Sequence, residues 1–417
     1  MDTITHGIVG ALAGKALFAG RDVPAEIAAN GTSSAISSPT ARAAIVACTL
    51  GSMFPDMDIF AGPLAHNPLA IMEWHRNITH SAIMLPIWAL LLAAVSMPLA
   101  RWVKWKSPPY LILSAIYGAG IASHILLDLV TNFGTMVWSP LRNSRLAWDW
   151  IYILDLTMTS IALVPQLAAW CYRESGQFWL RAFGAWAVLT AGAFGAYLLA
   201  RTSGYGFPLV FAGWVSAIFA GIIFLPAIKG AGFGWTRATW CRTGLIVLCA
   251  YIGLAAVTHK RALADVERFA AEQHLLGDNL AALPLPPSLT HWVGLITTPE
   301  GIWRIAFHEP GGIVETRRLY LNSQSLPLIE QAMKLRDVQV YLWFARFPVW
   351  RVVPLEEDET AVEITDLRFV READPFAASD LKKSKIAVSR PGRTGFTFEV
   401  LFDAKGQILS HGFKEPE

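Results

Sequence analysis

The sequence predicts an all-α polytopic membrane helix bundle of about eight helices, followed by a small extramembrane α+β domain with an antiparallel sheet. Two observations support this fold class. Only 16% of the 417 residues are charged and 54% are hydrophobic, whereas a soluble domain usually carries about 25% charged residues. Long uncharged runs also recur up to residue 259, but residues 260–417 have the composition of a soluble domain. We therefore expect a transmembrane domain over 1–259.

Six segments are apolar over roughly the 20 residues that a spanning helix needs. They are 81–100, 107–130, 151–171, 182–200, 206–228 and 243–258. Two further apolar segments, 6–20 and 41–55, are shorter, so we expect them to form short helices packed against protein. The N-terminal residues MDTITHG contain no basic region or cleavage site, so no removable signal peptide is expected. The four cysteines show no CxxC spacing and are expected to be buried or lipid-facing thiols.

Three segments outside the apolar runs complete the predicted organisation. Residues 20–40 are predicted to be a polar loop, and 260–291 an amphipathic helix followed by a proline-rich linker. Residues 292–417 alternate as strands do, and the turn Thr298-Pro299-Glu300-Gly301 between two apolar runs indicates a hairpin. We expect a soluble C-terminal α+β domain over 292–417, with one or two helices.

Lysine and arginine residues near the predicted helix ends indicate the orientation in the membrane. Ten lie on one side: Arg21, Arg42, Arg101, Lys104, Lys106, Arg173, Arg181, Lys229, Arg237 and Arg242. Six lie on the other: Arg76, Arg142, Arg145, Arg201, Lys260 and Arg261. Because cytoplasmic loops carry the excess of these residues, both termini and the C-terminal domain are expected on the non-cytoplasmic face.

Ionisable residues within or beside the apolar segments gather in four motifs. These are Thr5-His6, FPDMD over 54–58, HRNITHS over 75–81 and SHILLD over 123–128. Ionisable groups at membrane depth are costly and usually functional. His124 and Asp128 are four residues apart and therefore share one helix face.

The alternation of helices brings these motifs to the same membrane face. The start of the first helix, the end of the second, the start of the third and the end of the fourth all lie there. We therefore expect a metal site with the candidate ligands His6, Asp56, His75, His80, His124 and Asp128. Mixed imidazole and carboxylate ligands suit Zn²⁺ first, with Mn²⁺ or Fe²⁺ as alternatives. More than four candidate ligands leave room for one or two ions.

Three further residues are candidates for catalytic roles. Asp58 or Asp155 could act as a general base, and Arg76 could hold an anionic substrate group such as phosphate. Each motif also has a simpler interpretation. His6 could be an interfacial histidine, Asp56 and Asp58 helix caps, His75 a residue behind the ligands, and Arg76 a charge that sets topology.

The four motifs, in this order, resemble those of the LexA-binding, inner-membrane-associated metal-dependent hydrolases of the YdjM/YbcI type. The segments WDWIYILDL (148–156), FARFPVWRVV and ITDLRFV are similar to the longer YfhP-like members, so the resemblance covers most of the chain. It departs from the family pattern at Asn77 and Ile78, where a glycine and an aromatic residue are expected. The resemblance implies a multi-pass protein of the bacterial inner membrane that is a metal-dependent hydrolase.

The site composition favours hydrolysis, because paired metal ions usually activate water against an ester or phosphoester. The HxxxD spacing of His124 and Asp128 is also similar to that of zinc phospholipases C and implies a phosphoester or phospholipid substrate. Two other classes remain open: a non-catalytic, metal-stabilised membrane scaffold or regulator, and a transporter. The net charge of +2 does not indicate a nucleic-acid partner. The expected partner is the lipid bilayer, and a protein partner of the C-terminal domain stays open.

Overall fold

The computed structural model describes the chain in several stretches, and all structural statements below concern these residues. They are 1–18, 39–64, 66–202, 208–275, 277, 279–308, 310–312, 314–323, 326–355, 358–370, 387–388 and 396–414. The polar loop predicted over 20–40 lies outside them except for its last two residues, which begin a helix.

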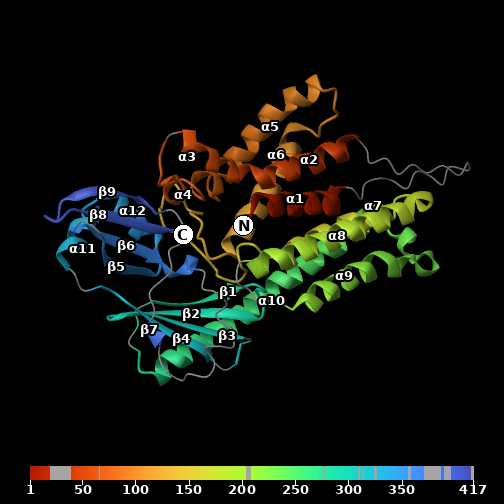
Figure 1. Cartoon of the computed structure of the whole chain (residues 1–417). Helices are drawn as coiled ribbons and strands as arrows, with labels where there is room; N and C mark the ends of the chain where they lie inside the picture. Colours follow the sequence, from red (N-terminus) through yellow and green to blue (C-terminus); the bar gives the residue numbers. More distant parts are fainter. Residues whose placement is uncertain are drawn as a thin grey trace, which may run out of the picture.

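Eight apolar helices lie alongside one another and form the membrane domain (Figure 1). They are α1 (Thr3–Phe18), α2 (Pro39–Met53), α5 (Leu85–Trp102), α6 (Tyr110–Leu129), α7 (Leu156–Cys171), α8 (Phe178–Thr202), α9 (Leu209–Phe224) and α10 (Arg237–Glu272). Among the described residues, six helical segments are long and apolar enough to cross a membrane. They are Thr40–Leu64, Leu85–Trp102, Tyr110–Leu129, Ser175–Arg201, Leu209–Gly234 and Arg237–Glu272. The expectation of about eight membrane helices is thus corrected to six candidates and two shorter apolar helices.

The correction concerns two segments. The predicted short helix 41–55 is part of a longer stretch, because α2 continues directly into the 3-10 helix η2 (Phe54–Phe60) and α3 (Ala61–Leu64). The predicted spanning segment 151–171 contains only the 16 residues of α7. This helix starts late because the carboxylate of Asp155 caps it, accepting a hydrogen bond from Met158 N at 2.8 Å.

The helices that carry the four motifs pack closely. α1 contacts α2, α7 and α10, while α6 contacts both α2 and α5. A side chain at Gly120 on α6 would place its Cβ 2.4 Å from the carbonyl oxygen of Cys48 on α2. Only glycine therefore permits this approach, which brings the end of α2 beside the end of α6. Cys48, Cys171 and Cys241 are buried and Cys249 is exposed on an apolar helix, as the sequence predicts.

The C-terminal part contains two sheets instead of the single predicted one. The first has the order β1-β2-β3-β4-β7, and the second the order β5-β6-β8-β9. The strands of the first are β1 (Asn279–Leu285), β2 (His291–Thr298), β3 (Gly301–His308), β4 (Val314–Leu321) and β7 (Ala387–Val388). Those of the second are β5 (Pro348–Pro354), β6 (Thr360–Asp366), β8 (Thr397–Phe402) and β9 (Ile408–Phe413). All neighbours pair antiparallel except the short β7, which pairs parallel to β4. The predicted hairpin is confirmed, since Thr298 pairs with Gly301.

The connection between the two domains differs from the predicted linker. α10 continues without interruption from the membrane domain to Glu272, so the amphipathic segment is its last part. Residues 279–285, which the prolines place in a linker, instead form β1 and pair with β2. They do so because residues 281–284 are buried in the core of the domain. α10 itself contacts β1 and β2. It therefore joins the two domains as one continuous element.

The second sheet and its helices α11 (Leu326–Ala332) and α12 (Arg336–Phe344) pack against the loops at one end of the bundle. Leu69, Met72 and Phe133 from these loops share one hydrophobic core with Tyr341 and Phe344. Figure 1 shows the sheets at the same end as the N-terminus and the short helix α4 (Ala70–Glu73). The C-terminal domain therefore covers the end of the bundle at which the four motifs meet.

Candidate metal centre

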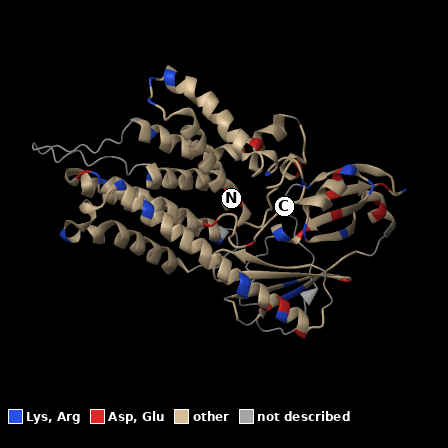
Figure 2. Ribbon diagram, turned by 180° about the vertical axis from the view of Figure 1, so that it is seen from behind, with Lys and Arg blue, Asp and Glu red and all other residues tan. Residues whose placement is uncertain are grey.

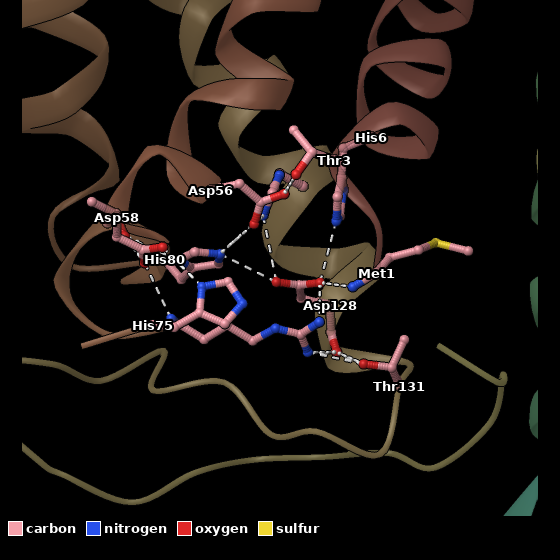
Figure 3. Close-up of polar contacts among 12 residues, drawn as sticks. Met1, Thr3, His6, Asp56, Asp58, His75, His80, Asp128 and Thr131 are labelled. Carbon is pink, nitrogen blue, oxygen red and sulfur yellow. Dashed lines mark hydrogen bonds and ion pairs between the residues drawn. The ribbon is translucent and has the colours of Figure 1, made fainter. Parts of the chain in front are cut away.

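The four motifs meet at one end of the bundle (Figure 3). His6 belongs to the first turn of α1, Asp56 and Asp58 to η2, and His124 and Asp128 to the end of α6. The loop before α5 contributes His75 and Arg76, and its 3-10 helix η3 (Ile78–His80) contributes His80. All of these elements end or begin at the same face because the helices alternate in direction.

Four side chains point their ligand atoms at one another, and we call them the inner quartet: Asp56, His80, His124 and Asp128. The Nε2 atoms of the two histidines are 3.0 Å apart. Each of these nitrogens lies 3.3–3.5 Å from Asp56 Oδ1 and Asp128 Oδ2. Ligands bound at about 2.0–2.1 Å to a tetrahedral zinc ion lie roughly 3.3 Å from one another. The spacing of the inner quartet therefore fits a tetrahedral ion.

The burial of the quartet also fits a cation. All four side chains are buried, and Asp128 Oδ2 has no hydrogen-bond partner among the described residues. A buried carboxylate oxygen without a donor is costly, because its lost hydration is not replaced. A divalent ion between the four ligand atoms would replace it. The residues present thus fit a metal ion with two nitrogen and two oxygen ligands, a donor set that zinc accepts.

Hydrogen bonds behind the two histidines set the direction of their Nε2 atoms. His124 Nδ1 donates to the carbonyl oxygen of Ser52 at 2.7 Å, which leaves the lone pair of Nε2 facing the quartet. His80 Nδ1 lies 3.3 Å from Asp58 Oδ2. A carboxylate behind a metal-binding histidine orients the ring and increases its basicity. Asp58 therefore stands behind the quartet as a positioning residue.

The ionisation of His80 reflects the same contacts. Burial alone lowers the pKa of His80, but its close contacts with the carboxylates of Asp128, Asp56 and Asp58 outweigh burial and raise the pKa to about 10. In the absence of an ion, His80 is therefore protonated, and its proton lies between the Nε2 atoms of His80 and His124. A metal ion would take the place of that proton.

Asp58 also connects the buried quartet to a partly exposed pair. It accepts hydrogen bonds from His75 Nδ1 at 2.8 Å and from the Thr79 hydroxyl at 2.8 Å. The side chains of His75 and Asp58 are 12% and 8% exposed, so this pair is the accessible edge of the cluster. Burial lowers the pKa of His75, against the hydrogen bond to Asp58. Asp58, His75 and His80 form a second group that could hold an ion.

Arg76 lies behind Asp128 and not in an open substrate site. Its Nη2 is 2.9 Å from Asp128 Oδ1, its Nη1 donates to the Thr131 hydroxyl at 2.9 Å, and its guanidinium lies 4.8 Å from the centroid of the Phe133 ring. The side chain is 1% exposed. These contacts make Arg76 a counter-ion that positions Asp128, which differs from the predicted contact with a substrate anion.

His6 lies beside the quartet. Its Nε2 is 3.2 Å from Asp128 Oδ1, which the amino group of Met1 also contacts, and its ring stacks on His124 with centroids 3.6 Å apart. His6 is therefore adjacent to the ligand atoms but is not one of the four that converge.

Two further acidic residues, the candidate general base Asp155 and Asp149, lie elsewhere. Asp155 caps α7, and its Oδ2 accepts hydrogen bonds from the hydroxyl groups of Tyr251, at 2.6 Å, and Ser288. Since both of its oxygens are occupied in this way, its position does not suit a general base for the quartet. Asp149 pairs with Arg346 of the C-terminal domain, with both carboxylate oxygens 2.9 Å from Nη1.

Sequence reasoning missed several residues that support the cluster. Thr3 donates to Asp56 Oδ2 at 2.6 Å, and Thr79 and Thr131 bind Asp58 and Arg76. Thr79 lies inside the HRNITHS motif, and this position could have indicated that it supports the cluster. The sequence did not indicate this role for Thr3 or Thr131, because a threonine at a helix end is common and usually serves as a cap.

The comparisons with known proteins find a family for the part of the chain that contains the cluster. No curated protein and no solved structure matches the chain significantly. The model of the family described as YdjM inner membrane protein matches residues 1–203, which include every member of the cluster. This match confirms the family predicted from the four motifs. The similarity to the YdjM inner membrane protein family thus covers residues 1–203, just under half of the chain, whereas the resemblance was expected over most of it.

Proposed function

We propose that this multi-pass inner-membrane protein is a metal-dependent hydrolase whose inner quartet binds one divalent ion, with zinc as the first candidate. The observation that carries the proposal is the convergence of two imidazole nitrogens and two carboxylate oxygens at tetrahedral spacing, with Asp128 Oδ2 lacking any other partner. A manganese or iron ion would accept the same donors. The second group, Asp58, His75 and His80, leaves room for a second ion.

In this proposal, different residues of the chain bind the ion, position its ligands and admit the substrate. A divalent ion supplies the Lewis acidity that polarises a water molecule and an ester or phosphoryl oxygen. Asp58 and Arg76 hold His80 and Asp128 in place, because each is hydrogen-bonded to a ligand side chain and is itself buried or nearly so. The accessible edge at His75 is where a substrate and water would approach, since the quartet itself is buried. The proposed substrate is a phosphoester or a phospholipid.

A second function is favoured by one observation. Four protein ligands complete a tetrahedral zinc site, and structural zinc sites are closed in this way, whereas catalytic ones keep a position open. The quartet is fully buried, and the recess of about 370 Å³ beside Glu73, Asn77 and Arg336 contains none of its members. A metal-stabilised membrane scaffold, in which the ion joins η2, η3 and α6, is therefore the alternative.

We further propose that the cluster and the C-terminal domain face away from the cytoplasm. Figure 2 shows Lys and Arg at the helix ends opposite the sheets. On the other face, the side chain of Arg76 is buried and that of Arg145 is partly buried, and both are bonded inside the protein: Arg145 donates to the carbonyl oxygens of Gly134 and His75. Because these two arginines serve internal contacts, fewer of the six basic residues counted on this face are available to set the topology.

The test begins with metal content. We would purify the full chain in detergent and measure bound metal by elemental mass spectrometry, beside an His124→Ala/Asp128→Ala variant and a Thr236→Ala control at the far end of α10. The proposal expects metal in the parent and the control but not in the double variant. An absence of metal after loading with Zn²⁺ or Mn²⁺ would contradict both functions.

The second step separates the two functions. Metal-loaded protein is incubated with soluble phosphodiesters and with phospholipid vesicles, and products are measured by mass spectrometry. Hydrolysis that is lost in the double variant supports the hydrolase. Metal binding that raises the unfolding temperature without any hydrolysis would favour the scaffold.

A further inference from the structure

The segment that carries Asp56 and Asp58 has two different faces. Within residues 54–64 every exposed side chain is apolar, and we call these residues the insertion face: Met57, Ile59, Phe60, Ala61, Pro63 and Leu64. Met57, Phe60 and Leu64 are 57%, 61% and 80% exposed. In contrast, Asp56 is buried, and Asp58 is turned toward His75 and His80. The two acidic residues and the insertion face therefore point in opposite directions from one short segment.

We infer that the insertion face is embedded in the lipid bilayer and holds the metal centre in the outer part of the hydrocarbon core, next to the lipid headgroups. The first argument is continuity. Residues Thr40–Leu64 form one helical stretch that is apolar and long enough to cross a membrane, and the insertion face is its last part. An apolar surface that continues a membrane-spanning surface has the bilayer as its nearest partner.

The depth of the neighbouring helix gives the second argument. α6 has 20 residues, about 30 Å at 1.5 Å per residue, which is the thickness of the hydrocarbon core. His124 is the fifteenth of these residues, so it lies about 21 Å from the far end of α6. Asp56 Oδ1 is 3.4 Å from His124 Nε2. His124 thus lies about 8 Å and Asp128 about 2 Å inside the near end of α6, so the quartet and the adjoining residue Met57 lie in the outer part of the hydrocarbon core, next to the headgroups.

An aromatic anchor beside the segment gives the third argument. The indole of Trp88 on α5 packs against Phe54, the first residue of η2, with ring centroids 5.3 Å apart. Its Nε1–H donates to the carbonyl oxygen of Ile78 at 3.0 Å. Tryptophan side chains with an apolar body and a bonded polar end are enriched at membrane interfaces. The insertion face thus adjoins a residue typical of the interface.

The consequence concerns what can reach the cluster. A molecule arriving from the side of the insertion face would be a bilayer lipid, and its headgroup would lie next to the ligand residues. The insertion itself does not depend on hydrolysis, so it holds or fails separately from the proposed function.

Spin-label accessibility in vesicles tests the inference. Single cysteines replace Phe60, Leu64 and, as a smaller change, Ala61, in the full chain with Cys249→Ser to remove the exposed thiol. The labelled protein is placed in phosphatidylcholine/phosphatidylglycerol vesicles, and collision rates with oxygen and with a water-soluble nickel complex are compared. Leu91→Cys, an exposed position within the spanning helix α5, is the lipid control, and Lys334→Cys in the C-terminal domain is the water control.

The expected result is that oxygen exceeds the nickel complex at 60, 61 and 64, as at 91, and that the order reverses at 334. An unfolding temperature equal to that of the parent shows that each labelled variant keeps its fold, and Ala61→Cys carries the test if a larger substitution does not. Preference for the nickel complex at these sites would overturn the inference in favour of a water-exposed face. Low collision rates with both reagents would overturn it in favour of a protein partner or a second copy of the chain.

Discussion

Two regions of this molecule bury charged side chains, and they do so in different ways. The first is the inner quartet with Arg76 and Asp58. The second, which we call the docking cluster, joins the C-terminal domain to the loops of the membrane domain and consists of Asp149, Arg346, Asp366 and Arg368. Both lie at the same end of the helix bundle. In the docking cluster Asp149, Asp366 and Arg368 are buried, whereas the side chain of Arg346 is 31% exposed.

In the docking cluster every carboxylate has an arginine. Arg346 binds Asp149, and Arg368 donates to Asp366 Oδ2 from Nε at 2.8 Å. The remaining donors of Arg368 reach backbone carbonyl oxygens, including those of Asn132 at 3.0 Å and Phe344 at 2.8 Å. Two carboxylates and two guanidinium groups balance in charge. This is the pattern of a buried ion pair that holds two parts of a protein together.

In the metal centre the charges do not balance. The three carboxylates of Asp56, Asp58 and Asp128 face one guanidinium, that of Arg76, which leaves a formal charge of −2; the proton on His80 reduces it to −1 before the amino group of Met1 is counted. One carboxylate oxygen has no donor, and two imidazole nitrogens face each other. The comparison teaches that a buried cluster with balanced charge holds the structure together, whereas one with surplus acceptors indicates a cation site.

The largest expected effect is the loss of bound metal when a ligand is removed. Asp128→Ala should reduce metal content to background, because the remaining three ligand atoms include the two facing nitrogens but no longer surround the ion. Asp149→Ala removes a carboxylate from the docking cluster instead and should retain metal. Elemental mass spectrometry on both variants decides the matter, and equal metal loss in the two would remove the distinction between the clusters.

The next effect concerns the docking cluster. Arg368→Ala leaves Asp366 buried without its partner, and breaking a buried pair costs about 3–5 kcal/mol of stability. We expect earlier chemical unfolding and faster proteolysis of the C-terminal domain, measured by denaturant titration and limited digestion. The double variant Asp366→Leu/Arg368→Met should recover part of the loss, since it leaves no unpaired charge. A single variant that is as stable as the parent would contradict the assigned role.

A smaller effect is expected for Asp58, which supports a ligand without belonging to the quartet. Asp58→Asn should lower metal affinity about 10–100-fold, the usual range for a residue behind a metal-binding histidine. The measurement is competition with a metal chelator of known affinity. Glu73→Gln, on the same loop but bonded to Asn67 and Arg336, is the control. An affinity that falls to background would instead make Asp58 a ligand itself.

The smallest effect is expected for an exposed pair at the opposite end of the bundle. Arg181 lies 3.1 Å from Glu174, whose side chain is 45% exposed. Exposed ion pairs contribute about 0–1 kcal/mol, so Glu174→Gln should change the unfolding midpoint only slightly and leave metal content unchanged. A large change there would mean that burial is not what separates the two buried clusters from ordinary surface pairs.

Much of the arrangement could be predicted from local patterns. The apolar runs predicted the membrane bundle, and the alternation of helices predicted that the four motifs share one face. The four-residue spacing of His124 and Asp128 predicted that both point to the same side of α6. The hairpin at Thr298–Gly301 followed from its turn residues in the same way. Each of these features depends on residues that are close in sequence.

The failures come from contacts between distant residues. The start of α7 at Leu156 depends on Asp155, whose carboxylate is held by Tyr251 and Ser288 from about 100 residues away or more. The strand β1 lies where prolines indicate a linker, because β2 offers it a partner. The contact of Arg76 with Asp128 likewise joins residues far apart in the sequence, so only the tertiary structure reveals it, and the predicted contact of Arg76 with a substrate anion stays a prediction.

By itself, the sequence determined which residue types reach one face of the membrane, because helix period and membrane thickness leave few alternatives for an apolar chain. Only the tertiary structure decided which of the six candidate ligands converge and which stand behind them. The distance between η2 and η3 decides whether Asp58 faces an ion or a histidine nitrogen. A change of a few ångströms would be enough, and packing across the whole bundle sets this distance.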